Sequence, residues 1–169
     1  SKEISKKFAE RVILQELGEL LVNRKLRYQT TLAGAVSWRE GALGSGGSWH
    51  VDSHSTQFKA MIYLSDVSEK NGPFEVVPGS HRPKWFLLFL LKNWLRLNST
   101  TRFEDSIIQK YDTVKILGKM GTLVLFNPLL VHRGAPLIEG ERFALTNYYV
   151  DSRLPNDSTI DLLDKAQKI

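Results

Sequence analysis

From residue 26 onward the sequence divides into short apolar or alternating runs, and this pattern constrains the fold more than any other feature. Turn-forming residues lie between most of the runs, as in the glycine-rich stretch 41–47, Asn71-Gly72-Pro73 and Glu139-Gly140. Short strands separated by turns are typical of a sandwich or barrel, and about eight strands form a double-sheet jelly roll. We therefore predict a mainly β fold with strands at residues 26–38, 48–53, 57–65, 74–78, 112–117, 122–126, 130–134 and 142–150.

Two segments depart from the strand pattern. Apolar residues recur at roughly helical spacing over residues 3–22, which predicts an N-terminal helix that Gly18 weakens locally. The second segment, residues 85–97, begins with an apolar run too short for the ~20 residues that span a bilayer. We expect it to form a helix within an insert at 83–108. It has three candidate roles: a buried helix or dimer contact, a lid over a lipid-like substrate, or a contact with a membrane surface.

Composition narrows the class of protein. A length of 169 residues fits a single domain, residues 1–169, with a core at about 26–150. The formal net charge is +5, but the basic residues are spread along the chain, which favours a solvated surface over a nucleic-acid patch. The chain has no cysteine, which excludes disulfides, iron–sulfur clusters and a cysteine nucleophile. With no signal peptide visible, we expect a cytoplasmic protein.

A histidine and a carboxylate lie two residues apart on a predicted strand. His50 and Asp52 therefore point to one face while Val51 points to the other. His132 lies in the later strand 130–134, which barrel closure can bring alongside. Two histidines and one carboxylate form the facial triad that binds Fe(II) and leaves positions open for substrate and oxygen, although zinc, manganese or cobalt can bind the same atoms. By itself the His-x-Asp pair is a weak signal, because His50 also fits a polar strand residue beside a loop.

A rival pairing joins His50 with His54, four residues later, as in a helical zinc site. Val51 stands where such a site has a glutamate, and the glycine-rich stretch opposes a helix. We therefore interpret His54 as a substrate-side residue, together with Trp49. His81 follows a turn and is interpreted as structural.

Five sequence blocks place these residues in a wider pattern. In chain order they are Trp49-His50-Val51-Asp52, Asp66-Val67-Ser68-Glu69-Lys70-Asn71-Gly72-Pro73, Val77-Pro78-Gly79-Ser80-His81-Arg82, Gly121-Thr122-Leu123-Val124-Leu125-Phe126 and Leu130-Val131-His132-Arg133-Gly134. Together they resemble the phytanoyl-CoA dioxygenase family of Fe(II)/2-oxoglutarate-dependent oxygenases, over about residues 26–150. The resemblance implies a double-stranded β-helix, that is, a cupin-like jelly roll. It also implies Fe(II) held by His50, Asp52 and His132.

The resemblance also implies a residue that anchors the co-substrate. The family places an arginine near position 142 to bind the distal carboxylate of 2-oxoglutarate, and Arg142 stands there. A guanidinium pairs with a carboxylate through two parallel hydrogen bonds, which suits this task. The alternative is a surface arginine on an edge strand. Arg133 is a poorer candidate, because it follows His132 directly and so points to the opposite face.

Other co-substrate contacts are less specific. Thr122, Gln29 and Tyr63 are candidates, with Thr31 and Met61 beside them, and roles in the barrel core or rim fit each of them equally. Gly134 stands where the family often has a hydroxyl residue in contact with 2-oxoglutarate.

The resemblance implies an enzyme that uses molecular oxygen and 2-oxoglutarate to hydroxylate an unactivated C–H bond of a small or lipid-like molecule, releasing succinate and carbon dioxide. Asp52 favours hydroxylation over halogenation, because related halogenating enzymes have a small residue in its place. One alternative is a non-enzymatic or 2-oxoglutarate-independent metal-binding jelly roll. A nucleic-acid demethylase is disfavoured, because those enzymes have a second arginine where this chain has Tyr148.

Overall fold

The computed structural model describes residues 2–37, 47–52, 55–82, 85 and 101–155. Within these ranges the helices are α1 (Lys2–Ala9), α2 (Val12–Val22) and α4 (Asp105–Ile108). The strands are β1 (Leu26–Ser37), β2 (Gln57–Tyr63), β3 (Phe74–Val76), β4 (Val114–Ile116), β5 (Leu123–Phe126), β6 (His132–Gly134) and β7 (Glu141–Asp151).

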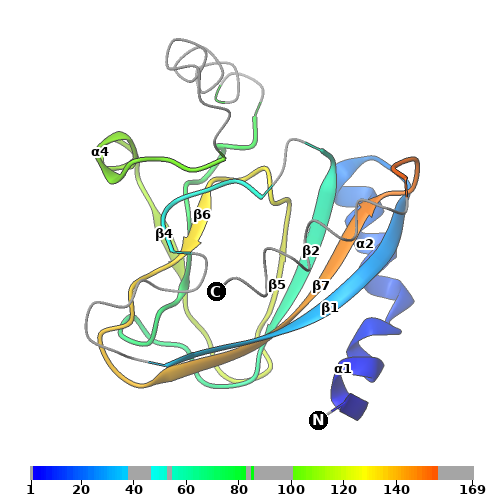
Figure 1. Cartoon of the computed structure of the whole chain (residues 1–169), viewed down its shortest axis with the longest axis horizontal. Coiled ribbons are helices and arrows are strands. Elements are labelled where there is room, and N and C mark those ends of the chain that lie inside the picture. The colour runs from blue at the N-terminus through cyan, green and yellow to red at the C-terminus, as the bar shows by residue number, and fades with distance from the viewer. Residues whose placement is uncertain (1, 38–46, 53–54, 83–84, 86–100, 156–169) are drawn as a thin grey trace.

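The strands form two antiparallel sheets (Figure 1). The larger sheet has the order β1-β7-β2-β5, and the smaller one has the order β4-β3-β6. β7 pairs with β1 along nearly its whole length, from Leu26 opposite Asp151 to Ser37 opposite Glu141. The mainly β, jelly-roll fold predicted from the sequence is confirmed.

The predicted strand at 48–53 differs from the structure. Among the described residues 48–52, only His50 forms a bridge, to Arg102 on one side and to His132 on the other. The next two backbone N–H groups have other acceptors: Val51 N–H donates to the Thr101 carbonyl, and Asp52 N–H donates to the Pro128 carbonyl. Because these hydrogen bonds go to two different segments, 101–102 and 128–132, no continuous ladder forms among the described residues.

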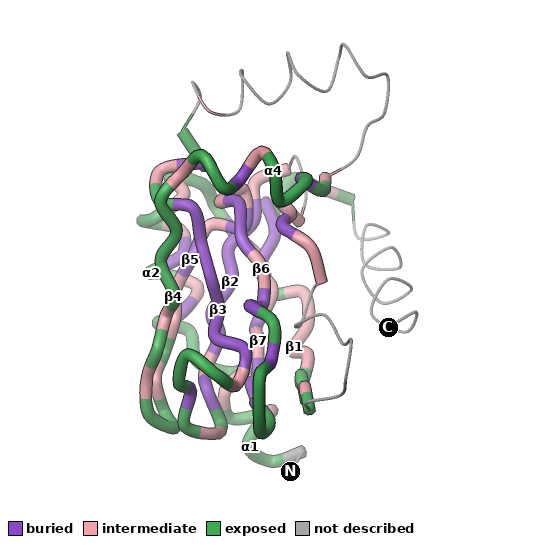
Figure 2. The backbone as a smooth tube through the Cα atoms, turned by 90° about the vertical axis from the view of Figure 1, so that its left-hand side faces the viewer, coloured by how far each residue is buried: buried purple, intermediate pink, exposed green. Residues whose placement is uncertain are grey.

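The two faces of the larger sheet bury different clusters. The outer face packs against α1 and α2 through Leu14, Leu26, Phe58, Ala60 and Tyr149. The inner face packs against the smaller sheet through Met61, Tyr63, Val67, Phe74, Val76, Phe126 and Ala144. Alternation along β2 and β7 assigns each side chain to one face. In Figure 2 buried residues follow β2 and β3 in particular, whereas exposed residues collect at the turns and along β4.

The single helix predicted over 3–22 is two helices in the structure. Arg11 has an extended backbone, with φ −77° and ψ 91°, and separates α1 from α2. The Asn147 side chain of β7 donates to the Phe8 carbonyl at 3.0 Å, so the end of α1 is tied to the sheet. A residue from the far end of the chain thus contacts the segment where the two helices meet.

A third cluster lies on the other side of the smaller sheet. It contains Trp49, Val51, Val77, Phe103, Ile108 and Val131, with Trp85 and Tyr111 packed against it. Most of the predicted insert at 83–108, including the predicted helix at 85–97 beyond Trp85, lies outside the described residues. No described helix has both the length and the apolar character that crossing a membrane requires.

Candidate metal centre

The two histidines meet through their backbones. His50 N–H donates to the His132 carbonyl and His132 N–H donates to the His50 carbonyl, both at 2.9 Å. This reciprocal pair sets the imidazole rings side by side, with centroids 4.5 Å apart. The two histidines are distant in sequence, and the topology of the barrel brings them together.

Each imidazole is oriented by a backbone carbonyl two residues earlier in the sequence. His50 Nδ1 lies 2.9 Å from the Ser48 carbonyl oxygen, and His132 Nδ1 lies 2.7 Å from the Leu130 carbonyl oxygen. A carbonyl can only accept a hydrogen bond, so Nδ1 carries the proton in both rings. The Nε2 lone pairs are therefore free to bind a metal ion, and this tautomer is the one that metal ligands commonly adopt.

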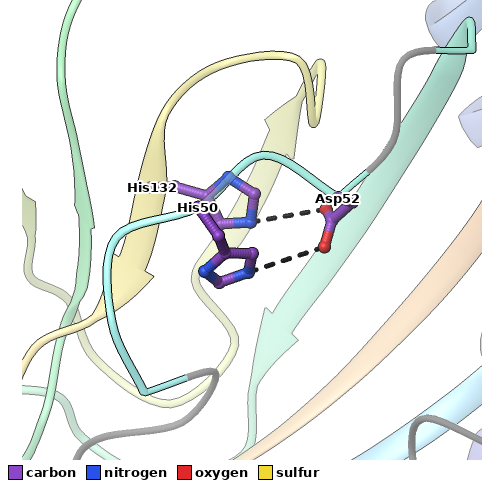
Figure 3. A group of neighbouring side chains, drawn as sticks. All are labelled: His50, Asp52 and His132. Atoms are coloured by element: carbon purple, nitrogen blue, oxygen red, sulfur yellow. Dashed lines mark ion pairs between the residues drawn. The ribbon is translucent and has the colours of Figure 1, made fainter. Parts of the chain in front are cut away.

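Asp52 faces both Nε2 atoms (Figure 3). Its Oδ1 lies 3.6 Å from His50 Nε2 and its Oδ2 lies 3.4 Å from His132 Nε2. Ligand atoms of the three residues lie within 4.8 Å of one another. Val51 belongs to the third cluster and points the other way, as strand alternation predicts.

The protonation states suit a cation. Burial alone would raise the pKa of Asp52, but Lys59 and the two histidines outweigh it and hold that pKa well below its ordinary value. Burial lowers the pKa of His132, with Asp52 opposing the shift in part. Asp52 is therefore ionised and His132 neutral at neutral pH, which are the forms that bind metal ions.

The donor set fits a divalent transition-metal ion. Two imidazole nitrogens and one carboxylate converge, and nitrogen with oxygen ligands suits Fe(II), as well as zinc, manganese or cobalt. Asp52 Oδ2 is buried, with the Lys59 ammonium group at 2.7 Å and His132 Nε2 at 3.4 Å.

Sequence reasoning missed Lys59. Its Nζ lies 2.7 Å from Asp52 Oδ2, and its side chain is 7% exposed. Lys59 stands on β2 between Phe58 and Ala60, which face the helices, so it points to the inner face. The available signal was a lysine within an otherwise apolar strand, because lysine is almost never buried without a partner.

Arg142 is also buried on the inner face, at 5% exposure. Arg142 is an even number of residues from Ala144 and Tyr148 on β7, so all three side chains point to the same face. Ala144 packs in the inner cluster and Tyr148 contacts Lys59. Its guanidinium donates to the Gly72 carbonyl, and burial lowers its pKa. No carboxylate among the described residues pairs with it, which is unusual for a buried cation.

Three further residues were candidates for co-substrate contact. Tyr63 is fully buried, and its hydroxyl donates to the Ile116 carbonyl and accepts from Phe74 N–H. Its hydroxyl therefore links the two sheets. Thr122 is four residues before Phe126, whose side chain points to the inner face, so alternation would direct Thr122 to that face as well. Its side chain instead lies against Gly118 at a turn. Gln29 lies at an irregularity in the pairing of β1 with β7, which can redirect a side chain.

Of the two predicted substrate-side residues, Trp49 is the one that the structure describes. Trp49 is 2% exposed in the third cluster, with the Arg133 guanidinium 4.3 Å from its ring centre. Because it points away from His50 and Asp52, we leave it out of the proposed site. His54 lies outside the described residues, and so does any pairing of His54 with His50. His81 is exposed in a turn.

Comparisons with known proteins place the fold among solved structures. AviO1 from Streptomyces viridochromogenes Tue57 has a similar structure, with a TM-score of 0.64 at 21% identity, covering 86% of this chain and 60% of AviO1. EctD from S. alaskensis, in a structure with 2-oxoglutarate and 5-hydroxyectoine, gives 0.62 at 19%, covering 86% and 51%. HygX from Streptomyces hygroscopicus, with iron bound, gives 0.60 at 21%, covering 91% and 70%.

The chain thus spans 60% of AviO1 and about half of EctD. No curated protein matches the sequence. The model of the family described as phytanoyl-CoA dioxygenase (PhyH) matches residues 3–138, which is most of the chain and includes all three candidate ligands. The chain belongs to the phytanoyl-CoA dioxygenase family.

Proposed function

We propose that this chain is an Fe(II)- and 2-oxoglutarate-dependent oxygenase that hydroxylates a small or lipid-like molecule. The observation that carries the proposal is Arg142, a buried guanidinium without a carboxylate partner in the described residues, on the same inner face of the larger sheet from which Lys59 contacts Asp52. A buried cation left unpaired is costly, and a carboxylate ligand removes that cost.

The three ligand residues have distinct tasks in this proposal. His50 and His132 would bind Fe(II) through Nε2, and Asp52 through a carboxylate oxygen, which leaves one face of the ion open. The bound iron supplies the oxygen chemistry, while the protein supplies binding and orientation. The backbone carbonyls of Ser48 and Leu130 hold the imidazoles in the required tautomer.

Arg142 would bind the distal carboxylate of 2-oxoglutarate through its planar fork of N–H groups. The Gly72 carbonyl, which already accepts one of its hydrogen bonds, fixes the side chain in place. Asp52 supports hydroxylation over halogenation, because a carboxylate ligand occupies the position that halogenating relatives leave small.

The Arg142 assignment is tested by replacing it with alanine. We expect Arg142→Ala to bind Fe(II) as the wild type does, and to bind 2-oxoglutarate at least about tenfold more weakly, because a charged hydrogen-bonded pair contributes roughly 1.5–3 kcal/mol. The measurement is the visible charge-transfer band of Fe(II) with 2-oxoglutarate under anaerobic conditions, titrated with the co-substrate.

A matched control is Arg153→Ala, which removes a largely exposed arginine paired with Asp151 and should leave the titration unchanged. A wild-type protein that binds Fe(II) but never develops the band would refute the oxygenase proposal, and would favour a metal-binding jelly roll without co-substrate turnover. Succinate release with lipid, acyl-CoA, amino-acid and small-alcohol candidates then identifies the substrate class.

A further inference from the structure

A buried lysine lies directly beside the proposed metal ligands. The Lys59 ammonium group is 2.7 Å from Asp52 Oδ2 and 4.2 Å from the centre of the Tyr148 ring. Its position is fixed from both sides of β2, since Lys59 pairs with Tyr148 on β7 and with Phe126 on β5. Neither the family match nor the likeness to solved structures assigns this residue a role.

Asp52 is the only carboxylate that contacts either Lys59 or the two histidines in the described residues. Without a metal, the Asp52 and Lys59 charges balance. A divalent cation bound to the triad must share the same carboxylate with Lys59, so the centre would then carry two excess positive charges. A triad without the lysine would carry only one.

The excess charge has a direct consequence for binding. Two cations close together repel strongly in buried surroundings, because little water or salt is there to screen them. A dicarboxylate dianion such as 2-oxoglutarate would bring one carboxylate to this centre and, in the proposed function, the other to Arg142, so it would offset part of the excess charge. The metal alone is therefore disfavoured by Lys59, whereas the metal together with the dianion is favoured.

Building on the proposed function, we propose that Lys59 couples the two binding steps: its charge weakens the binding of the divalent ion alone and strengthens the binding of the dianionic co-substrate to the metal-loaded protein. Lys59 acts here through its charge and its contact with Asp52, and the Tyr148 ring keeps the ammonium group in place through a cation–π contact.

The test compares Lys59→Met, which keeps the chain length and removes the charge, with Lys59→Arg, which keeps the charge. Isothermal calorimetry measures Mn(II) binding alone, and then 2-oxoglutarate binding to the Mn(II)-loaded protein. In Lys59→Met we expect Mn(II) to bind about tenfold more tightly and 2-oxoglutarate about tenfold more weakly, given the size of charge interactions at partly screened sites. Lys59→Arg should keep both affinities near the wild-type values.

These opposite changes distinguish a charge effect from structural damage, since a misfolded site loses affinity for both ligands. Weakening of both constants in Lys59→Met, or no change in either, would overturn the inference. If that variant does not fold, as judged by circular dichroism with Mn(II) present, Lys59→Gln provides the same neutral test. Lys119→Met is the matched control, because Lys119 lies 2.8 Å from Asp66 Oδ2 on the exposed surface.

The two proposals fail in different ways. A wild-type protein that binds Mn(II) but not 2-oxoglutarate would refute the proposed function, while the Mn(II) measurement still tests Lys59. Normal 2-oxoglutarate binding with the same Mn(II) affinity in wild type and Lys59→Met would refute the role of Lys59 alone.

Discussion

At the scale of single residues, each of the two histidines has a sequence neighbour whose side chain points to the outer side of the smaller sheet. These two neighbouring side chains contact each other. Arg133 follows His132, and its guanidinium lies over the ring of Trp49, which precedes His50. Arg133 Nε also donates to Glu75 Oε2 at 2.8 Å, and Thr113 donates to the other oxygen at 2.9 Å. Arg133 thus connects the backbone next to both histidines to Glu75, on the side of the smaller sheet opposite the proposed ligands.

Replacing Arg133 with methionine should lower the free energy of unfolding by about 2 kcal/mol, because it leaves the Glu75 carboxylate buried without its charge partner. It should also weaken Mn(II) binding about tenfold, as residues that orient metal ligands commonly do. Urea unfolding and calorimetry measure the two effects.

Asp105 provides the control for this prediction. Its contact with Arg133 is 3.5 Å long and Asp105 is largely exposed, so Asp105→Ala should change stability by less than about 0.5 kcal/mol. A Mn(II) affinity unchanged in Arg133→Met would show that Arg133 does not position the ligands.

At the scale of secondary structure, α2 lies unusually close to the larger sheet. Gly18 is buried on this helix, and a Cβ atom there would overlap the Phe58 ring of β2. Glycine costs a helix about 1 kcal/mol relative to alanine, so local propensity alone would disfavour it. The close approach explains why this position has no side chain.

Gly18→Ala should therefore destabilise the protein by about 1 kcal/mol net, because overpacking costs roughly 1–3 kcal/mol and exceeds the gain in helix propensity. Gly34→Ala, on β1, is the comparison, since nothing lies within 4 Å of its Cβ position. That change should stabilise the protein by about 0.5 kcal/mol. Thermal and urea unfolding of both variants check the opposite signs, and a stabilised Gly18→Ala would contradict the packing argument.

At the scale of the whole molecule, the candidate centre connects the two sheets. His132 belongs to β6 of the smaller sheet, while Lys59 and Tyr148 belong to β2 and β7 of the larger one, and Asp52 contacts both groups through His132 and Lys59. A metal ion bound here would therefore link elements that separate on unfolding.

Metal binding should raise the thermal unfolding midpoint. At a free Mn(II) concentration of 100 times Kd, linkage adds about 2.7 kcal/mol, which for a domain of this size corresponds to roughly 5–10 °C. Scanning calorimetry with and without Mn(II) measures the shift. His132→Ala should lose it, and a shift that persists in this variant would place the ion elsewhere.

Much of this organisation follows from the sequence. Period-two alternation correctly sets His50 with Asp52 on one face, Val51 on the other, and Arg133 away from the centre. Most strand positions also follow, because apolar runs and turn residues are local signals, but the predicted strand at 48–53 is reduced to the bridge at His50 in its described residues. The break between α1 and α2 was not predicted, because the apolar spacing continues through Arg11; in the structure Asn147 of β7 contacts Phe8 beside the break.

What the sequence by itself determined is most of the strands and the alternation of their side chains between two faces, because both depend on neighbouring residues. Only the tertiary structure decided which distant residues meet: His50 with His132, Lys59 with Asp52, and Arg142 with the Gly72 carbonyl instead of a carboxylate. These pairings depend on how the two sheets close on each other, and that closure is set by long-range strand pairing and burial.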